Sequence, residues 1–275
     1  MSRRHELEQR LRKLGEIGEI MRSMKNLALM ETRKLARFLD IQNDSVLMIE
    51  TAAADFLQFN PHLALPSGKQ ALLVIGSERG FCGDFNEELL NALGSDHSPD
   101  SPILGVGGKL CTRLEKHPAL AGQFDGPTVA EDVPKTLNQL IPAIGRLQET
   151  QECDGLTVLH HRSGIESIAR KSLLPPFTEN AAPDPKLHHS PLLNLAPGQF
   201  FAELVHHYLF AALHEIFYTS LMAENQRRIQ HLEGAIQRLE EKNEILARKS
   251  RTLRQEEITE EIEVILLSVE GAGQG

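Results

Sequence analysis

The sequence predicts an α/β protein made of a long antiparallel coiled coil of its N- and C-terminal helices, with a small open α/β sheet domain inserted between them. Two observations predict this class. Apolar residues at both ends of the 275-residue chain recur at alternating steps of three and four, which is the seam of a coiled coil. Short apolar runs alternate with helical patterns in the middle, which is typical of a mostly parallel sheet. The expected segments are a shaft helix over 1–60, the α/β domain over 61–197 and a second shaft helix over 198–275.

The C-terminal seam is the more regular of the two. It runs through ten positions without a slip: Met222, Asn225, Ile229, Leu232, Ile236, Leu239, Asn243, Leu246, Ser250 and Leu253. It then moves over by one residue and resumes at Ile258, Ile262, Ile265 and Val269, so the supercoil must relax locally. A helix from about Pro197 to Glu270 would be on the order of 100 Å long. A rod of that length with polar seam positions needs a partner helix.

The partner helix is expected at the other end of the same chain. No Pro occurs between Glu6 and Phe59, and Asn60-Pro61 ends the pattern because Pro lacks an N–H and restricts the residue before it. A three–four seam runs through Leu14, Ile17, Met21, Met24, Ala28, Glu31, Leu35 and Phe38. Because well over a hundred residues separate the two helices, they are expected to pair antiparallel. The predicted register places Met21 and Met24 beside the region 246–258.

The middle of the chain alternates strands with helices. Strands are expected at 71–75, 102–106 and 155–159, each a short apolar run. The expected helices cover 87–93, 109–116 and 133–150, the last with Pro142 inside it. The stretch that ends in Pro175-Pro176 is interpreted as irregular, and the Pro-rich segment 181–197 returns the chain to the second long helix. The expected sheet is open, mostly parallel and Rossmann-like, with right-handed crossovers.

The turn from Gly76 to Gly83 is the one place that could carry chemistry. Its glycines are spaced loosely like a phosphate-binding turn, but the G-x-G-x-x-G spacing and a Walker lysine are missing. Cys82 in this turn has no identifiable base, so a small residue in a tight turn is favoured over a nucleophile.

Metal binding is disfavoured on similar grounds. Glu203 and His206 have the spacing of one di-iron ligand pair, but the second pair is missing. The residues His206, His207 and His214 are therefore expected to be surface or hinge residues. The sequence predicts no catalytic residue, no cofactor and no metal.

Charge is segregated along the chain. The formal net charge is −9, yet residues 1–39 hold ten Lys/Arg against five Asp/Glu, and residues 227–254 hold eight against four. Basic helices can bind nucleic acid. No nucleic-acid motif or aromatic interleaving accompanies these helices, and the rest of the chain is acidic, so no nucleic acid is expected. An acidic protein partner around the basic helices is favoured, and solvated helix faces account for part of the same pattern.

No apolar run approaches the ~20 residues that span a bilayer. The first residues lack the apolar region of a signal peptide. Three cysteines, at positions 82, 111 and 153, have no spacing that suggests a disulfide framework or a zinc site. The chain is expected to be a reduced bacterial protein.

Three stretches together resemble the gamma subunit of the F-type ATP synthase, as a divergent bacterial member. The most specific match is Val74-Ile-Gly-Ser-Glu-Arg-Gly-Phe-Cys-Gly83 with the following Phe85-Asn86, which is similar to the family's S-D-R-G-L-C-G-G-F-N. The segment Arg254-Gln-Glu-Glu-Ile-Thr-Glu-Glu-Ile262 is similar to the family's R-Q-A-A-I-T-Q-E-I. Further positions fit in register in the two helices: Leu11, Arg12, Leu14, Ile20, Met24, Lys25, Ala28, Glu224, Arg228 and Ala235. The region 95–191 matches only in plan.

The resemblance implies a central rotor shaft that couples ion flow through a membrane c-ring to ATP synthesis or hydrolysis. Alpha and beta subunits would surround the shaft, and the epsilon subunit and the c-ring would contact a foot formed by the α/β domain. Catalysis would belong to beta, and the chain would meet the cytoplasmic face of the bacterial inner membrane only through the complex, as a peripheral protein. Arg254 and Gln255 match positions that touch a catch loop on beta, and Met24 and Lys25 match the N-terminal helix opposite. Arg227 is expected on a more exposed part of the shaft.

The sequence departs from the family pattern at several positions. Met21 stands for the usual Thr, Ser23 for Ala, Glu31 for Lys and Arg251 for Asn, and Leu-Ser replaces a Gly-Ala pair before Val269. Two other classes are weighed beside the rotor. A structural coiled-coil scaffold needs no motif match, and a nucleotide-binding α/β enzyme would need the central sheet to hold a phosphate.

Overall fold

The computed structural model describes residues 3–64, 68–96, 101–150, 153–163, 168–177 and 192–272. Two long helices, α1 (Arg3–Phe59) and α5 (Pro197–Ala272), begin and end the described chain. The chain forms two compact units: one combines the residues up to 27 with those from 230 onward, and the other comprises 28–229. Both long helices therefore contribute to both units, which cut across the three segments expected from the sequence.

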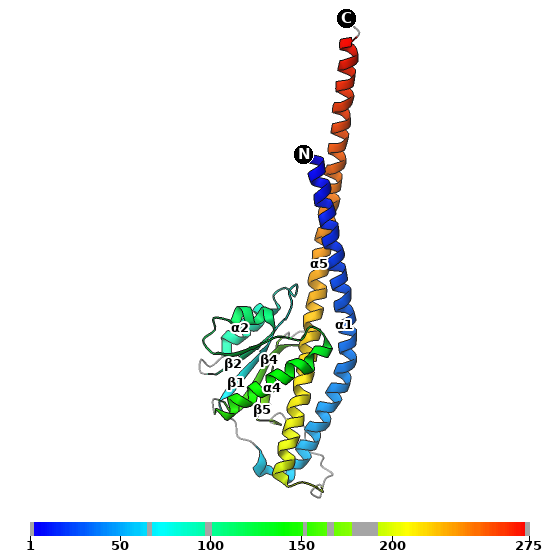
Figure 1. Cartoon of the computed structure of the whole chain (residues 1–275). Helices are drawn as coiled ribbons and strands as arrows, with labels where there is room; N and C mark the ends of the chain where they lie inside the picture. Colours follow the sequence, from blue (N-terminus) through cyan, green and yellow to red (C-terminus); the bar gives the residue numbers. More distant parts are fainter. Residues whose placement is uncertain are drawn as a thin grey trace. The chain divides into compact units, whose positions relative to one another are not determined.

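The unit 28–229 contains a five-stranded sheet in the order β3-β2-β1-β4-β5 (Figure 1). The central strand β1 (Gln70–Ile75) lies between β2 (Ile103–Val106) and β4 (Gly155–His161) and is parallel to both. The strand β3 (Leu120–Phe124) adds parallel to β2 at one edge. The strand β5 (Ile168–Leu174) adds antiparallel to β4 at the other edge. The expected open, mostly parallel sheet is confirmed.

Successive residues of β1 face opposite sides of the sheet, as the period of a strand requires. Leu72 and Val74 belong to one buried cluster, to which α2 (Phe85–Asp96) contributes Phe85, Leu89 and Leu93. The short helix α3 (Gly108–Leu114) adds Leu110 and Leu114 on the same side. These two helices therefore cover one face of the sheet.

The opposite face carries the larger core. Leu73 and Ile75 of β1 pack in one cluster with α4 (Val133–Glu149), which follows a short 3₁₀ turn at Ala130–Asp132. Helix α5 contributes six buried residues to this cluster: Tyr208, Ala211, Ala212, Leu213, Ile216 and Phe217. Helix α1 reaches the same core through Val46. The second face is thus held by apolar contacts from both long helices.

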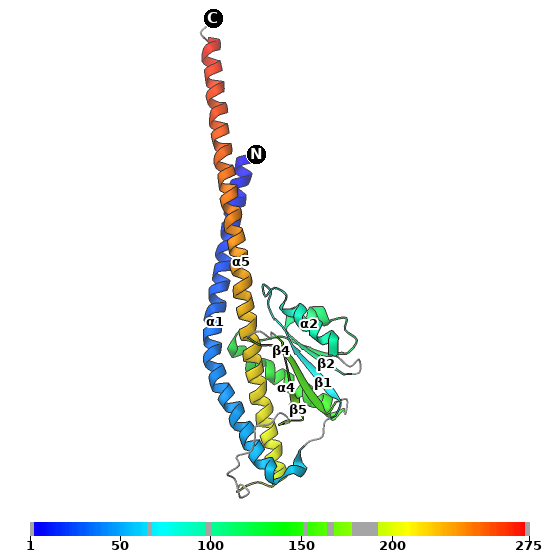
Figure 2. The ribbon, with the colours of Figure 1, turned by 180° about the vertical axis from the view of Figure 1, so that it is seen from behind.

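In the other unit the two helices pair antiparallel and lie side by side in opposite views (Figures 1 and 2). Buried Met21 packs with Leu232 and Ile236, and half-buried Met24, Ala235 and Leu239 surround them. Three ion pairs flank the seam: Arg4–Glu257 at 3.3 Å, Arg22–Glu240 at 2.7 Å and Lys25–Glu233 at 3.3 Å. The antiparallel shaft is therefore present, with charged side chains along its margins.

The register expected for this pair is wrong. Met21 and Met24 lie beside 232–239, about two heptads closer to the start of α5 than the region 246–258. A heptad seam repeats every seven residues, so the sequence pattern alone cannot distinguish one register from the next. Gly18 faces α5 in the observed register, where a Cβ at this position would lie 3.3 Å from Leu239 Cδ2. The missing side chain makes room for that leucine.

Two members of the expected N-terminal seam are exposed. Ile17 is 47% exposed, and the neighbouring Gly18 takes the buried position instead. Phe38 is 37% exposed and packs at the margin against Tyr218, with ring centroids 5.8 Å apart. A strict three–four spacing of apolar residues selects Ile17 and not Gly18, because glycine does not count as apolar in that pattern. In the structure the buried position is Gly18.

The seam expected beyond Leu253 is also not formed. Ile258, Ile262 and Ile265 are about half exposed, and the side chain of Val269 lies outside the described residues. Arg4, at the start of the described part of α1, already pairs with Glu257. The exposure of these three side chains shows that the apolar positions after Leu253 do not form a buried seam.

The sequence interpretation missed both edge strands. β3 was not expected at all, and β5 lies in the stretch that was interpreted as irregular. Residues of β3 alternate between half-buried and exposed, and β5 is buried only at Leu173 and Leu174. Edge strands bury less surface than central ones, so neither shows the continuous apolar run that identified β1, β2 and β4. The other expected strands and helices are confirmed within a few residues of their predicted ends.

Candidate functional site

The turn between β1 and α2 holds the most specific sequence match and is a compact, internally bonded loop. Phe81 and Gly83 have positive φ angles of 67° and 62°, so the chain reverses sharply around Cys82. At the start of the turn, Asn86 accepts a hydrogen bond from the backbone N–H of Ser77 at 3.0 Å and donates one to its hydroxyl at 2.8 Å. The Asn of the matching motif therefore fixes the turn rather than a ligand.

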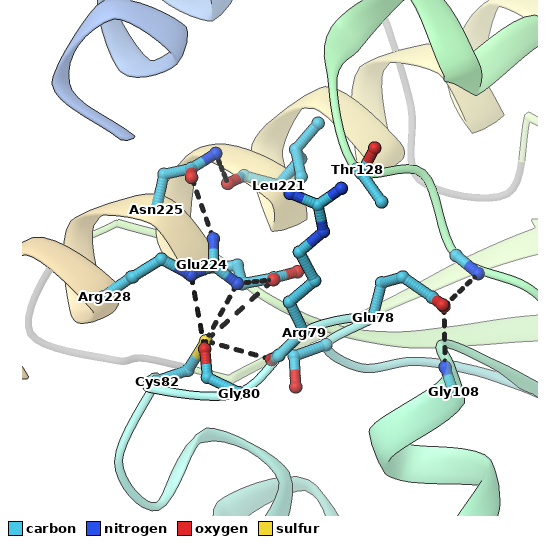
Figure 3. Close-up of polar contacts among 12 residues, drawn as sticks. Glu78, Arg79, Gly80, Cys82, Gly108, Thr128, Leu221, Glu224, Asn225 and Arg228 are labelled. Carbon is cyan, nitrogen blue, oxygen red and sulfur yellow. Dashed lines mark hydrogen bonds and ion pairs between the residues drawn. The ribbon is translucent and has the colours of Figure 1, made fainter. Parts of the chain in front are cut away.

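Helix α5 contacts this turn through a buried ion pair. Glu224 and Arg228 are four residues apart, are bonded to each other, and are 4% and 7% exposed. Arg228 Nη2 donates to Cys82 Sγ at 3.2 Å, and Nε donates to the Gly80 carbonyl at 3.3 Å (Figure 3). Burial raises the pKa of Glu224, and Arg228 together with the backbone N–H groups of residues 78 and 79 opposes that rise. The pair thus joins one face of α5 to the loop through the bonds of Arg228 to Gly80 and Cys82.

Asn225 completes this cluster. Its Oδ1 accepts from Arg228 Nη1 at 2.9 Å, and its Nδ2 donates to the Leu221 carbonyl at 3.0 Å. It is 3% exposed, although it occupies a seam position where an apolar residue is usual. A polar residue there, beside Glu224 and Arg228 at helical spacing, was the available sequence signal for a buried polar network. Glu224 and Arg228 match the family as separate positions, and no local pattern in the sequence shows that they form a buried pair.

Cys82 is not an activated nucleophile. Burial raises the pKa of its thiol to about 12, and the nearby Glu224 carboxylate acts in the same direction, while Arg228 opposes both. The thiol is therefore protonated at neutral pH, whereas a nucleophilic cysteine needs its thiolate. Its Sγ lies 3.4 and 3.5 Å from the carbonyl oxygens of Gly80 and Arg79, to which it can donate. The expectation of a small residue in a tight turn holds, with a polar contact that the sequence did not reveal.

The place where doubly wound sheets hold a phosphate is occupied by the chain itself. Glu78 Oε2 accepts the backbone N–H groups of Gly108 and Gly126, each at 2.7 Å (Figure 3). These groups follow β2 and β3 at the carboxyl edge of the sheet, where ligands of such folds bind. A carboxylate of the protein thus takes the amides that would otherwise face an anion.

The glycines at this edge serve backbone packing. Gly107 has φ 108°, and a Cβ there would lie 2.7 Å from the Gly76 carbonyl oxygen. A Cβ on Gly76 would lie 2.5 Å from Leu110 Cβ. At the point where strand order reverses, between β1 and β4, His161 stacks on Phe85 with ring centroids 3.8 Å apart. Two stacked rings therefore lie at the edge of the sheet where a nucleotide would bind in folds of this kind.

Glu31, a departure from the family pattern, has a clear structural role. Its Oε1 accepts the backbone N–H of Ala130 at 2.7 Å, and its Oε2 lies 2.8 Å from Lys34 Nζ. Lys34 also donates to Glu131 at 2.6 Å. Burial alone would lower the pKa of Lys34, but its hydrogen bonds to Glu131 and Glu31 outweigh that effect and raise it. The carboxylate of Glu31 therefore ties α1 to the segment before α4.

The four residues expected to contact other subunits fall into two separate groups. Met24 and Lys25 lie by the buried Leu232–Ile236 pair, where Lys25 bonds Glu233. Arg254 and Gln255 are exposed and lie about 30 Å further along α5, since 21 residues separate Glu233 from Arg254. Met24 is therefore not opposite Arg254, contrary to the expectation. Whether any of them contacts another subunit stays a prediction.

Two further sequence expectations are corrected. Arg227 is not on a free part of the helix, because its Nη2 donates to both carboxylate oxygens of Glu88, at 2.9 and 3.0 Å. His206 and His207 are exposed, but His214 is buried, with Nδ1 2.8 Å from the Phe210 carbonyl. Within the described ranges, no three His, Cys, Asp or Glu side chains are grouped so as to hold a metal ion. No described helix is both long and apolar enough to cross a membrane.

The geometry defines a class of protein: an antiparallel helical pair whose helices also hold an α/β domain, in which Glu78 bonds the backbone amides of the usual phosphate site. A family model described as ATP synthase matches residues 3–271. The chain therefore belongs to the ATP synthase family.

Curated relatives include ATP synthase gamma chains of Clostridium botulinum, strains Langeland and Okra. Each is 22% identical, over 94% of this chain and 95% of the relative. Among solved structures, a rotor of the Euglena gracilis mitochondrial ATP synthase gives a TM-score of 0.61 at 16% identity, covering 93% of this chain and 98% of that one. Another structure of the Euglena gracilis mitochondrial ATP synthase, described as OSCP/F1/c-ring, gives a TM-score of 0.64 at 16% identity. The match covers 99% of this chain and 96% of that one. A structure of the central stalk and c-ring of the Tetrahymena thermophila mitochondrial ATP synthase gives a TM-score of 0.56 at 16% identity. The match covers 78% of this chain and 99% of that one.

Proposed function

We propose that this chain is the central rotor shaft of an F-type ATP synthase and couples ion flow through a membrane c-ring to ATP synthesis or hydrolysis. The observation that carries the proposal is the antiparallel pairing of α1 and α5 in a chain that the family model matches from residue 3 to residue 271. The chain performs no catalysis itself. Its role is to transmit torque to the subunits that do.

The mechanism follows from asymmetry. A single two-helix shaft inside a ring of three beta subunits presents a different surface to each of them. Each orientation then favours a different nucleotide affinity in each beta subunit, which is a population shift driven by rotation. Arg254 and Gln255 are exposed and available for a contact with an acidic segment of beta, whereas Arg22 and Lys25 at the margins of the helical pair already bond Glu240 and Glu233 of this chain.

We assign the remaining partners from the same proposal. Alpha and beta subunits surround the paired helices, and the epsilon subunit and the c-ring contact the α/β domain. The chain then lies at the cytoplasmic face of the bacterial inner membrane as a peripheral component, and it meets the membrane only through the complex.

Affinity purification of the tagged chain from its native host tests the proposal. The expected result is co-purification of the alpha and beta subunits with an ATPase activity that the isolated chain lacks. Recovery of the chain without them would favour the alternative, a structural coiled-coil scaffold. Nucleotide binding by the isolated chain would favour an enzyme, which the carboxylate of Glu78 on the amides of Gly108 and Gly126 argues against.

A further inference from the structure

The buried Glu224–Arg228 pair stands at a distinctive place along α5. Residues 208–217 of this helix join the α/β domain through a broad apolar core. Further along, the cluster on the other face of the sheet receives one buried α5 residue, Ala223. The methyl group of Ala223 buries little apolar area against this face of the sheet. The unit that contains the sheet ends at Ile229, one residue after Arg228.

The polar groups therefore carry much of the contact between this end of α5 and the β1–α2 turn. Arg228 bonds Gly80, Cys82 and Asn225 at 2.9 to 3.3 Å, and Glu224 is paired with Arg228. A second polar link joins Arg227 to Glu88 on α2, but both side chains are partly exposed, and such pairs contribute little.

Stability alone does not account for such a pair. Replacing a buried ion pair by apolar residues of similar volume is often neutral or stabilising, because burial removes the hydration of both charges. Directional hydrogen bonds restrain the orientation of the groups that they join. Bonds to fixed backbone groups weaken steeply when the angle changes, so they add an angular restraint to the apolar packing of the helix. A cluster of this kind resists slip and rotation.

We propose that Glu224 and Arg228 are positioning residues that lock the rotation of α5 to that of the α/β domain, so that torque passes between them without slip. This inference rests on the proposed rotor function. Torque applied to the α/β domain must reach α5 before the helix leaves this unit. The cluster fixes the rotational angle of the helix at that point, because the guanidinium of Arg228 bonds the Gly80 carbonyl and Cys82 Sγ in the turn while Asn225 and Glu224 hold it from the helix.

The test uses the assembled complex with the double variant Glu224→Met/Arg228→Met, which keeps side-chain volume and removes both charges. The first readout is the number of ions pumped per ATP hydrolysed. The second readout is the torque on a bead attached to a cysteine that is introduced on the α/β domain. The three native cysteines of the chain are buried, so the introduced thiol is labelled in preference to them. We expect unloaded hydrolysis close to wild type, with a several-fold loss of torque and of pumping per ATP. Wild-type torque in this variant overturns the proposal.

A second variant covers the case in which the double variant fails to assemble. Arg228→Lys keeps the charge beside Glu224 but cannot bond Gly80, Cys82 and Asn225 together. We expect it to assemble and to lose torque measurably, and full torque in it overturns the proposal.

A cross-link separates coupling from a merely structural role. Ser163 and Gln226 lie at the same junction, with Oγ and Oε1 2.8 Å apart. Cysteines at both positions, joined by a short bismaleimide in the Arg228→Lys background, should restore torque. Failure of the cross-linked complex to recover contradicts the proposal. If beads on the wild-type complex do not rotate at all, the proposed function is wrong. If they rotate and the variants also give full torque, only this inference is wrong.

Discussion

Replacing Leu232 by Ala tests the packing of the helical pair most sharply. Leu232 is 0% exposed and packs between Met21 and Ile236, with Met24 and Leu239 close by. A buried Leu→Ala change costs about 2–5 kcal/mol, and the cost rises with the cavity that remains. The site lies between only two helices, which can partly collapse onto the gap. We therefore expect about 2–3 kcal/mol, at the lower end of that range.

Urea unfolding followed by far-ultraviolet circular dichroism measures this effect. With a slope of about 2–3 kcal/mol/M, the midpoint of the transition that reports on the helical pair should fall by about 1 M. Leu266→Ala is the matched control, because it is the same change on the same helix at a side chain that is 58% exposed. The control should shift stability by no more than about 0.5 kcal/mol. Equal midpoints for the two variants would show that Leu232 is not packed against α1.

The remaining predictions concern backbone, charge and the proposed contacts. Gly15→Ala should stabilise α1 by about 0.5–1 kcal/mol, because its Cβ would meet nothing within 4 Å. Gly18→Ala should stabilise the helix less, because the side chain of Leu239 must move to make room for the Cβ. Thermal unfolding of the two variants measures the difference. The hydrogen bond from Lys34 holds the pKa of Glu131 below its usual value, so this bond stabilises the fold above about pH 4.5 and is lost as the pH falls through the lowered pKa. The stability difference between wild type and Glu131→Gln should therefore be present at pH 7 and vanish in acid, and a constant difference would contradict the assignment. Arg254→Ala should assemble but turn over poorly, with a loss of about 2–5 kcal/mol if Arg254 bonds a desolvated group of beta. Arg248→Ala, whose side chain is 75% exposed, should be mild, and equal ATPase rates for the two complexes would remove the special role of Arg254.

Much of the fold could be predicted from the sequence because its signals are local. Helix ends at Phe59 and Pro197 follow from proline chemistry, and β1, β2 and β4 follow from apolar runs. The ten-residue seam of α5 also predicts which face is turned inward, since all of its members are at least half-buried.

What the sequence could not supply depends on contacts between distant residues. The register of α1 against α5 is ambiguous by whole heptads in the sequence, whereas the structure places Met21 against Leu232 and Ile236 and Gly18 against Leu239. The edge strands β3 and β5 form because their neighbours offer hydrogen bonds, not because their own residues form an apolar run.

The candidate site was predicted only in part, for the same reason. The turn around Cys82 was identified as the most specific motif, but its partners come from α5, more than 140 positions away. Arg228 at Cys82 and Glu78 at Gly108 are contacts made by folding, and no local spacing encodes them.

Rotation against beta is the central claim, and a reversible cross-link tests it most directly. A cysteine at Leu27, which is 65% exposed and lies two residues after Lys25, is paired with one on an acidic segment of beta. Oxidation should stop ATP hydrolysis by the complex, and reduction should restore it. With labelled beta subunits, re-oxidation after turnover should join the chain to any of the three. Undiminished hydrolysis in a fully cross-linked complex, or re-formation only with the original beta after turnover, would contradict the rotor account.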